Sequence, residues 1–100
     1  MQTINMENKT FNFNIPLLGL DGVPFVNPDS TPTTLGAQLA PKIASATQGD
    51  ALKLLNWAIT IYNNKDLTLD LSDELTLKDF IKNSDLPVIV KGQLLKVFDK

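Results

Sequence analysis

Residues 50–63, DALKLLNWAITIYN, decide the fold, because their pattern predicts a helix that is apolar around most of its circumference. A typical surface helix has the opposite pattern, an apolar stripe roughly 100° wide on a polar cylinder. Here the polar residues recur at spacings of 3, 4 and 3 and share one narrow stripe, made of Lys53, Asn56, Thr60 and Asn63. We therefore expect residues 50–63 to form the central buried helix, covered on more than one side, with Trp57 in the core.

The N-terminal third of the chain predicts a β-hairpin. Residues 10–15, TFNFNI, alternate apolar and polar side chains, as a half-buried strand does. Asp21 and Gly22 stand between two short apolar runs, and this pair favours a tight turn that needs positive φ angles. We predict a hairpin over about residues 10–26, with its second strand weakened by Pro24.

A loop and a helix follow the predicted hairpin. Residues 27–34, NPDSTPTT, are rich in proline and small polar residues, which predicts a loop. Thr34 is a suitable N-cap for a helix that runs from residue 35 to about residue 46. Pro41 lies inside this helix and lacks an N–H group, so we expect a kink or two short helices.

The C-terminal third predicts one short strand and two helices. Residues 67–71, LTLDL, alternate again and are a candidate to join the N-terminal hairpin. Ser72 is the predicted N-cap of a helix that ends near residue 83. Residues 86–98 predict a last helix, with a small hairpin around Gly92 as the alternative. We find no internal repeat in the chain.

These elements predict an α+β domain, in which the N-terminal β-hairpin packs on a layer of three to four helices around the helix at about 50–63. One hundred residues are enough for one domain. We place that domain at residues 10–100 and expect a flexible N-terminal arm over residues 1–9, which are polar and rich in Asn.

The composition excludes several classes of site. The chain has no Cys and no His, so thiolate zinc sites and triads that use an imidazole base cannot form within one chain. All nine basic residues are Lys and the net charge is −2, which does not favour direct nucleic-acid binding. No window is apolar enough to cross a membrane. We expect no catalytic residues, no cofactor and no bound metal.

Acidic residues are densest between residues 66 and 79, which raises the question of a cation site. Asp70, Ser72 and Asp73 lie at the junction between the predicted strand and the following helix. Side chains of these types at such a junction cap the helix N-terminus. We therefore interpret them as capping groups.

The remaining candidate is an interaction surface on the predicted hairpin. Its apolar side chains are numerous, and an uncovered apolar face of this kind marks a contact surface for a partner. Its strand edge also offers unpaired backbone groups to another chain. The candidate interaction residues are Phe11, Phe13, Ile15, Leu18, Leu20 and Phe25. The alternative is that this face simply lies on the helices.

The order of the segments resembles small single-domain proteins of tailed bacteriophages and prophages. The matching segments span most of residues 10–98 and comprise Leu20–Gly22, Thr34–Gly36, Gly49–Asn63 and Leu67–Asp73. The resemblance implies a viral or mobile-element origin and a role in binding protein. It implies no activity, cofactor or catalytic residue.

Two functions are therefore expected as alternatives. The first is a non-catalytic protein–protein interaction module, a small phage assembly or virion-associated protein that forms a homo-oligomer or binds a phage structural protein. The second is a phage-encoded acidic inhibitor that binds a host nucleic-acid-processing enzyme. Either protein would act in the cytoplasm of a bacterial host or on the virion.

Overall fold

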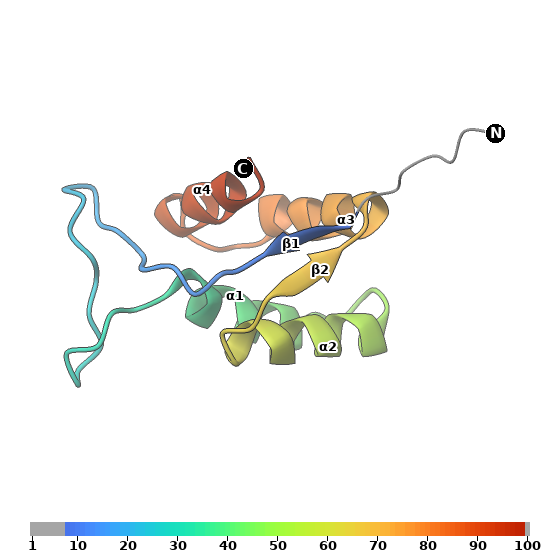
Figure 1. Ribbon diagram of the computed structural model, residues 1–100, viewed down its shortest axis with the longest axis horizontal. Helices are drawn as coiled ribbons and strands as arrows, with labels where there is room; N and C mark the ends of the chain where they lie inside the picture. Colours follow the sequence, from blue (N-terminus) through green and yellow to red (C-terminus); the bar gives the residue numbers. More distant parts are fainter. Residues whose placement is uncertain (1–7, 100) are drawn as a thin grey trace.

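A computed structural model describes residues 8–99 of the protein (Figure 1). Over these residues the chain forms two strands and four helices, in the order β1 (Lys9–Phe11), α1 (Leu35–Ala44), α2 (Ala51–Tyr62), β2 (Leu67–Leu69), α3 (Leu71–Asn83) and α4 (Val88–Val97). The predicted α+β class, with an antiparallel two-stranded sheet and a helical layer, is confirmed.

The two strands pair across 58 residues of sequence. Lys9 lies opposite Leu69 and Phe11 opposite Leu67, in antiparallel register. The strand predicted at 67–71 thus joins the N-terminal strand, and residues 10–15 do not pair with the segment after the Asp21-Gly22 turn as the predicted hairpin required. This pairing turns Phe11, Leu67 and Leu69 toward the helices, where all three are buried.

The core lies between this sheet and the four helices. The strands run between α2 and α3, and both helices contact β2 (Figure 1). The rings of Phe11 and Phe13 pack against Phe98, with centroid distances of 4.9 and 5.8 Å. The largest fully buried side chains come from the strands, their flanks and all four helices: Phe13, Leu35, Leu39, Ile43, Ile61, Leu69, Leu77, Ile81 and Leu94.

Helix α2 occupies the predicted position, but only one of its faces is buried. Trp57, Ala58 and Ile61 are the buried residues of this helix. The prediction that neighbours cover its broad apolar arc on several sides is therefore wrong. The reason is that α1 and the sheet contact α2 from one side, and no element among residues 8–99 lies on the other.

Side chains cap three of the helices. Thr34 accepts a hydrogen bond from the Ala37 amide and Asp50 accepts one from the Lys53 amide, both at 3.1 Å. At the start of α3 the capping residue is Asp70, which accepts from the Asp73 amide at 2.8 Å. The predicted cap, Ser72, already lies inside that helix.

Two expectations about helix continuity are also decided. Helix α1 continues through Pro41 as a single element, so of the two predicted alternatives, a kink or two short helices, the second is wrong. Residues 88–97 form α4, which confirms the helical prediction over the hairpin alternative. Gly92 lies inside α4, and a Cβ added to it would have no heavy atom within 4 Å.

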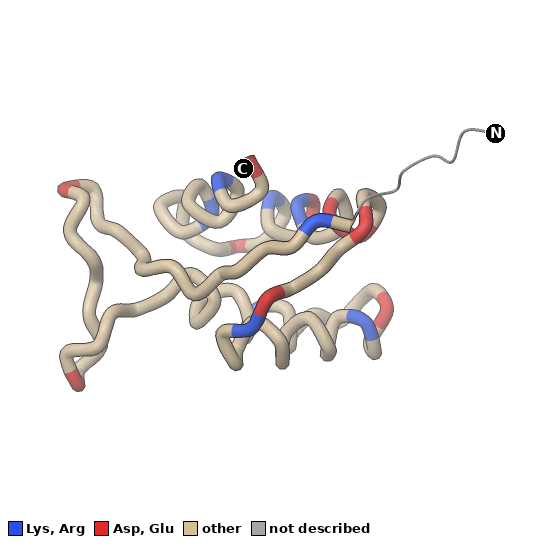
Figure 2. Tube along the Cα trace, in the orientation of Figure 1, with Lys and Arg blue, Asp and Glu red and all other residues tan. Residues whose placement is uncertain are grey.

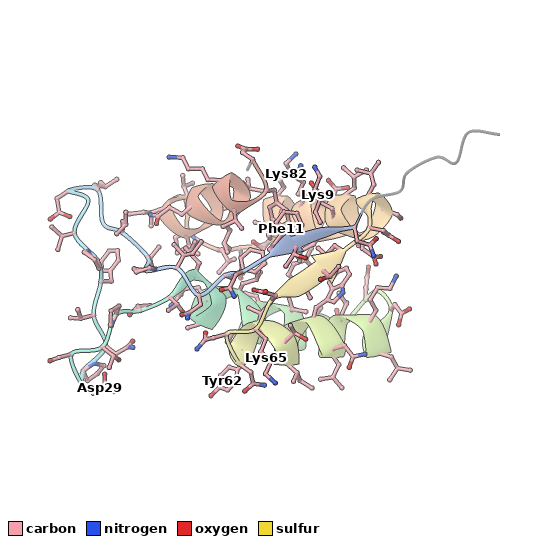
Figure 3. The ribbon with its side chains drawn as sticks, viewed as in Figure 1. Lys9, Phe11, Asp29, Tyr62, Lys65 and Lys82 are labelled. Atoms are coloured by element: carbon pink, nitrogen blue, oxygen red, sulfur yellow. The ribbon has the colours of Figure 1, made fainter. Side chains whose placement is uncertain are left out.

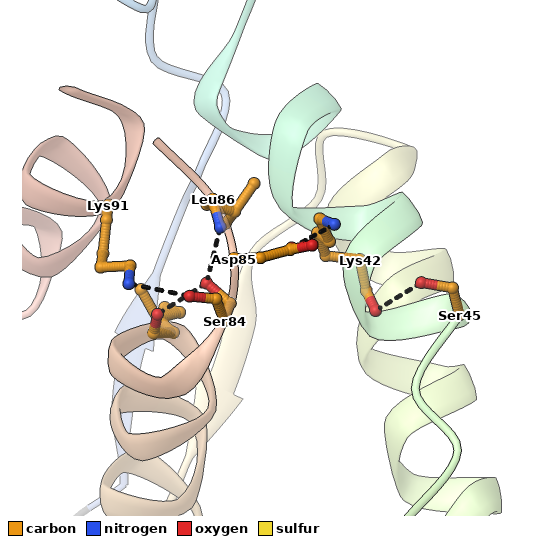
Figure 4. Close-up of polar contacts among 7 residues, drawn as sticks. Lys42, Ser45, Ser84, Asp85, Leu86 and Lys91 are labelled. Atoms are coloured by element: carbon orange, nitrogen blue, oxygen red, sulfur yellow. Dashed lines mark hydrogen bonds and ion pairs between the residues drawn. The ribbon is translucent and has the colours of Figure 1, made fainter. Parts of the chain in front are cut away.

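The connection between α3 and α4 is fixed by polar contacts (Figure 4). The Lys91 ammonium donates to the carbonyl oxygens of Ser84 at 2.8 Å and Lys82 at 3.1 Å. Asp85 in the same connection forms an ion pair with Lys42 of α1. The Lys91 contacts satisfy carbonyl groups at the end of α3, and the ion pair connects the α3–α4 segment to α1.

None of the helices within residues 8–99 is both long enough and apolar enough to cross a membrane. The predicted flexible arm over residues 1–9 lies mostly outside the described residues. Lys9, its last residue, begins β1.

Candidate functional site

Residues 15–34 leave the helical body and return to it as a three-sided loop (Figure 1). This segment, called the three-sided loop below, contains no regular strand or helix. It extends the long dimension of the protein, whose principal extents are 54, 29 and 23 Å. Residues 21–30 within it are all exposed, so the loop offers surface to other molecules.

Three backbone hydrogen bonds close the loop into a ring. The Leu17 amide donates to the Thr33 carbonyl at 2.8 Å, and the Thr33 amide donates to the Phe25 carbonyl at 2.9 Å. The Phe25 amide then donates to the Leu17 carbonyl at 2.9 Å, which completes the cycle. Each of the three sides therefore contacts the other two, and the shape does not depend on a core of its own.

Two corners of the ring have the same construction. At the first, the Gly22 amide donates to the Gly19 carbonyl at 2.9 Å, and at the second the Ser30 amide donates to the Asn27 carbonyl at 2.9 Å. Gly22 and Ser30 both have positive φ, 78° and 72°. This backbone region is open to glycine and strained for serine, so the second corner needs additional support.

That support comes from an aspartate at each corner. The Asp21 carboxylate accepts from the Val23 amide at 3.0 Å, and the Asp29 carboxylate accepts from the Thr31 amide at 3.1 Å. Asp29 also accepts from the Thr31 hydroxyl at 2.6 Å. The hydroxyl and the amide of Thr31 hold the pKa of the Asp29 carboxyl below its usual value of 3.8.

Three prolines of the ring are spaced by eight residues, at positions 16, 24 and 32. Pro16, Pro24 and Pro32 each take part in an isolated antiparallel bridge between two sides. The hydrogen bonds of each bridge are made by the neighbouring residues, so the proline occupies a position where no N–H donor is needed. The prolines are therefore compatible with this pairing.

The ring is attached to the body at its base and along one side. The Leu35 amide donates to the Ile15 carbonyl at 2.8 Å, where α1 begins. On the side facing α4, the Gln93 amide group both accepts from the Leu18 N–H at 2.9 Å and donates to the Leu18 carbonyl at 2.7 Å. This pair of hydrogen bonds imitates a neighbouring strand and fixes the loop against α4.

The loop exposes large apolar side chains on this fixed backbone. Leu20 is 98% exposed at the first corner, and Val23, Phe25 and Val26 are also exposed. A groove of about 360 Å³ lies between the loop and α4, with Leu18, Leu20, Leu35 and Val97 in its walls. This combination of exposed apolar residues and an adjoining groove can bind an apolar side chain of another protein.

The structure separates the six predicted interaction residues. Leu18, Leu20 and Phe25 are exposed on the three-sided loop. Phe11 is buried at 5% exposure by the pairing of β1 with β2, and Phe13 is buried at 2% exposure against Phe98. For these two residues the predicted surface position is wrong, whereas Ile15 is half-buried and lines the groove between the loop and α4.

The structure adds three contributors to the six predicted interaction residues. Val23 and Val26 are more exposed than Phe25, and Gln93, from a distant helix, holds the loop in place. The eight-residue spacing of Pro16, Pro24 and Pro32 was the available signal for the ring. No signal pointed to Gln93, because its contact spans 75 residues of sequence.

Charged residues of both signs are spread over the molecule (Figure 2), with acidic and basic side chains together on α3 and lysines as the charged residues of α1, α2 and α4. Lys53 lies 2.8 Å from the Asp73 carboxylate, and this contact raises the pKa of the lysine. Lys42 beside Asp85 lowers the pKa of that carboxyl. The alternative of an acidic inhibitor gains no particular support from this distribution and stays a prediction.

Residues 8–99 contain no group of three acidic side chains placed to hold a metal ion. The predicted capping role is confirmed for Asp70. Comparisons with protein-family models, with curated proteins and with solved structures found no match for this chain. The arguments about function therefore rest on the three-sided loop and on the other exposed surfaces of the molecule.

Proposed function

We propose that this protein is a non-catalytic protein–protein interaction module that contacts its partner through the three-sided loop. The observation that carries the proposal is the exposure of Leu20, Val23, Phe25 and Val26 on a backbone held by a closed ring of hydrogen bonds. Exposed apolar side chains of this number are unfavourable in water unless a partner covers them. A fixed backbone also lowers the entropy lost when the partner binds.

The chemistry of the loop favours a partner with an apolar docking surface. Its first corner presents Leu20 beside the groove formed with α4. Lys96 is the charged residue in the wall of that groove. The expected contact is therefore driven by burial of apolar area and depends little on salt.

The biological setting in this proposal comes from the resemblance to small phage and prophage proteins. In that setting the module is an assembly factor or a virion-associated protein, and its partner is a phage structural protein. It would then act in the cytoplasm of a bacterial host or on the virion.

Affinity capture from phage-infected or prophage-induced bacteria tests this proposal. The baits are the wild type, Leu20→Asp in the loop and Val88→Asp as a matched control at an exposed position on α4. We expect the wild type and Val88→Asp to retain a phage structural protein, identified by mass spectrometry, and Leu20→Asp to lose it. Equal recovery by all three baits would contradict binding through the loop.

The same experiment separates the proposal from the inhibitor alternative. Repeating the capture at low and high salt shows whether the contact is apolar or electrostatic. Recovery of a basic host enzyme that is lost at high salt, with no phage structural protein, would favour the inhibitor.

A further inference from the structure

Helix α2 carries a second apolar surface, separate from the three-sided loop. Its outward face contains Leu52, Leu55, Ile59 and Tyr62, with exposed fractions of 76%, 49%, 49% and 70%. These residues are spaced by 3, 4 and 3 positions. That is the spacing of the a and d positions in two heptads of a coiled coil, where side chains of one helix fit between those of another. Tyr62 lies at the end of α2 on the outer side of the molecule (Figure 3).

The surroundings of this face are apolar or uncharged. Lys53 is the one charged residue of α2, and it is paired with Asp73 of α3. Asn56 and Asn63, which flank the apolar row, are exposed and neutral. Because no like charges would oppose each other, two copies of this face can meet without electrostatic cost. A face without charges also offers nothing to attract a strongly charged partner.

Helix α1 leaves room for another helix beside this row. Ala40, Pro41 and Ala44 of α1 and Leu55, Ile59 and Tyr62 of α2 line a shallow groove of about 300 Å³. Because the side chains of the two alanines are small, the surface of α1 is recessed beside the row. A helix that packs on the row can therefore approach α2 closely while its side chains enter the groove.

We propose that two copies of this chain associate through α2, with the two helices antiparallel about a twofold axis. In this arrangement Leu52 of each copy packs against Tyr62 of the other, and Leu55 packs against Ile59. The face is then self-complementary, as a twofold interface requires. The proposal rests on the proposed function only in that the protein works by binding protein, since it concerns a different surface.

The size of the face fits a dimer of moderate affinity. A fully exposed aromatic side chain presents roughly 200 Å² and an aliphatic one less, so the exposed fractions of the four residues correspond to at most about 500 Å² per copy. Two faces bury at most about 1,000 Å² before Pro41 and Ala44 are included, somewhat below the roughly 1,200 Å² at which stable interfaces begin. We therefore expect monomer and dimer to exchange with concentration.

Light scattering coupled to size-exclusion chromatography, over a wide range of concentrations and at low and high salt, is the first test. The wild type and Val88→Glu, which changes an exposed apolar residue of α4, should dimerise equally. Ile59→Glu places a carboxylate at the centre of the proposed contact and should raise the dimer dissociation constant by at least about tenfold. A wild type that stays monomeric throughout, or an Ile59→Glu variant that dimerises normally, would overturn the proposal.

Disulfide cross-linking tests the orientation, since the chain has no native cysteine. In an antiparallel pair the two Asn56 residues lie beside the contact with an axial offset of about 3 Å, whereas the two Leu52 residues lie about 15 Å apart along the axis. A separation of about 15 Å is too long for a disulfide, so Leu52→Cys should not form a covalent dimer under mild oxidation, and Asn56→Cys should form one more readily. Cross-linking of Leu52→Cys alone would overturn the antiparallel arrangement.

The loop variant Leu20→Asp separates this inference from the proposed function. It should dimerise like the wild type, because the loop takes no part in the α2 contact. If Leu20→Asp loses phage partners and still dimerises, both proposals are supported. If Leu20→Asp prevents dimerisation, the copies meet through the three-sided loop and the α2 interface is wrong.

Discussion

The helical body and the three-sided loop are held together by different forces. The body buries large side chains from every element, and residues such as Leu39, Leu77 and Leu94 are wholly removed from water. The loop buries little beyond Leu17 and is fixed by a ring of backbone hydrogen bonds, two corner aspartates and a clamp from Gln93. The comparison shows how a segment can have a defined shape while its apolar side chains remain free for contact.

The largest effect should come from the body. Trp57→Ala removes a side chain that is 6% exposed on the buried face of α2 and should lower the free energy of unfolding by about 3–5 kcal/mol. The measurement is urea unfolding monitored by circular dichroism. Ile59→Ala on the outer face of the same helix is the control, and its loss should be clearly smaller. Equal losses would mean that the two faces of α2 are not distinguished by burial.

The clamp between the two regions should have an intermediate effect. Gln93→Ala removes both hydrogen bonds to the Leu18 backbone, each worth about 0.5–1.5 kcal/mol. We expect faster limited proteolysis within the three-sided loop and a stability loss of about 1–3 kcal/mol. Gln93→Glu keeps an acceptor for the Leu18 N–H but removes the donor to its carbonyl, so it should not rescue the clamp. Unchanged proteolysis in both variants would show that the loop is fixed without Gln93, by its attachment at Ile15 and Leu35.

Two glycine-to-alanine variants, one in each region, should change the free energy of unfolding in opposite directions. Gly22 has a φ of 78° at the first corner, and Gly22→Ala should cost about 1–2 kcal/mol because a side chain is strained there. Gly92 lies inside α4 with nothing within 4 Å of an added Cβ, and Gly92→Ala should stabilise the protein by about 0.5–1 kcal/mol. Equilibrium unfolding of both variants checks the signs. If both variants change the free energy of unfolding in the same direction, the expected difference between the loop and the helical body is wrong.

The smallest effect concerns the second corner and its pH dependence. The pKa of Asp29 is lowered by its contacts with Thr31, so the ionised carboxylate supports the corner above the usual pKa of 3.8. That support should be lost as the pH falls through the lowered pKa of the folded protein. The Thr31 amide resonance in an NMR titration reports the change. Asp29→Asn keeps an oxygen acceptor without this titration and should remove the shift, whereas an unchanged titration would assign it to another group.

Local sequence patterns were enough to place the regular elements. The apolar periodicity and the Thr34 cap located α1 and α2 to within a few residues, and the Asp21-Gly22 pair identified the first corner of the loop. These features depend on neighbours in sequence, such as a side chain that accepts a hydrogen bond three residues on. The exposed residues Leu18, Leu20 and Phe25 were predicted for the same reason, since they adjoin that turn.

What the tertiary structure alone decided was which apolar surfaces are covered. Pairing of β1 with β2 buried Phe11, and Phe13 packs against Phe98 in the core, although sequence reasoning had assigned both to an interface. The position of α1 left Leu52 and Tyr62 exposed on a helix that its composition predicted to be surrounded. The physical reason is that apolar patterning specifies how much surface a segment must bury, and contacts between segments distant in sequence determine which face meets a neighbour.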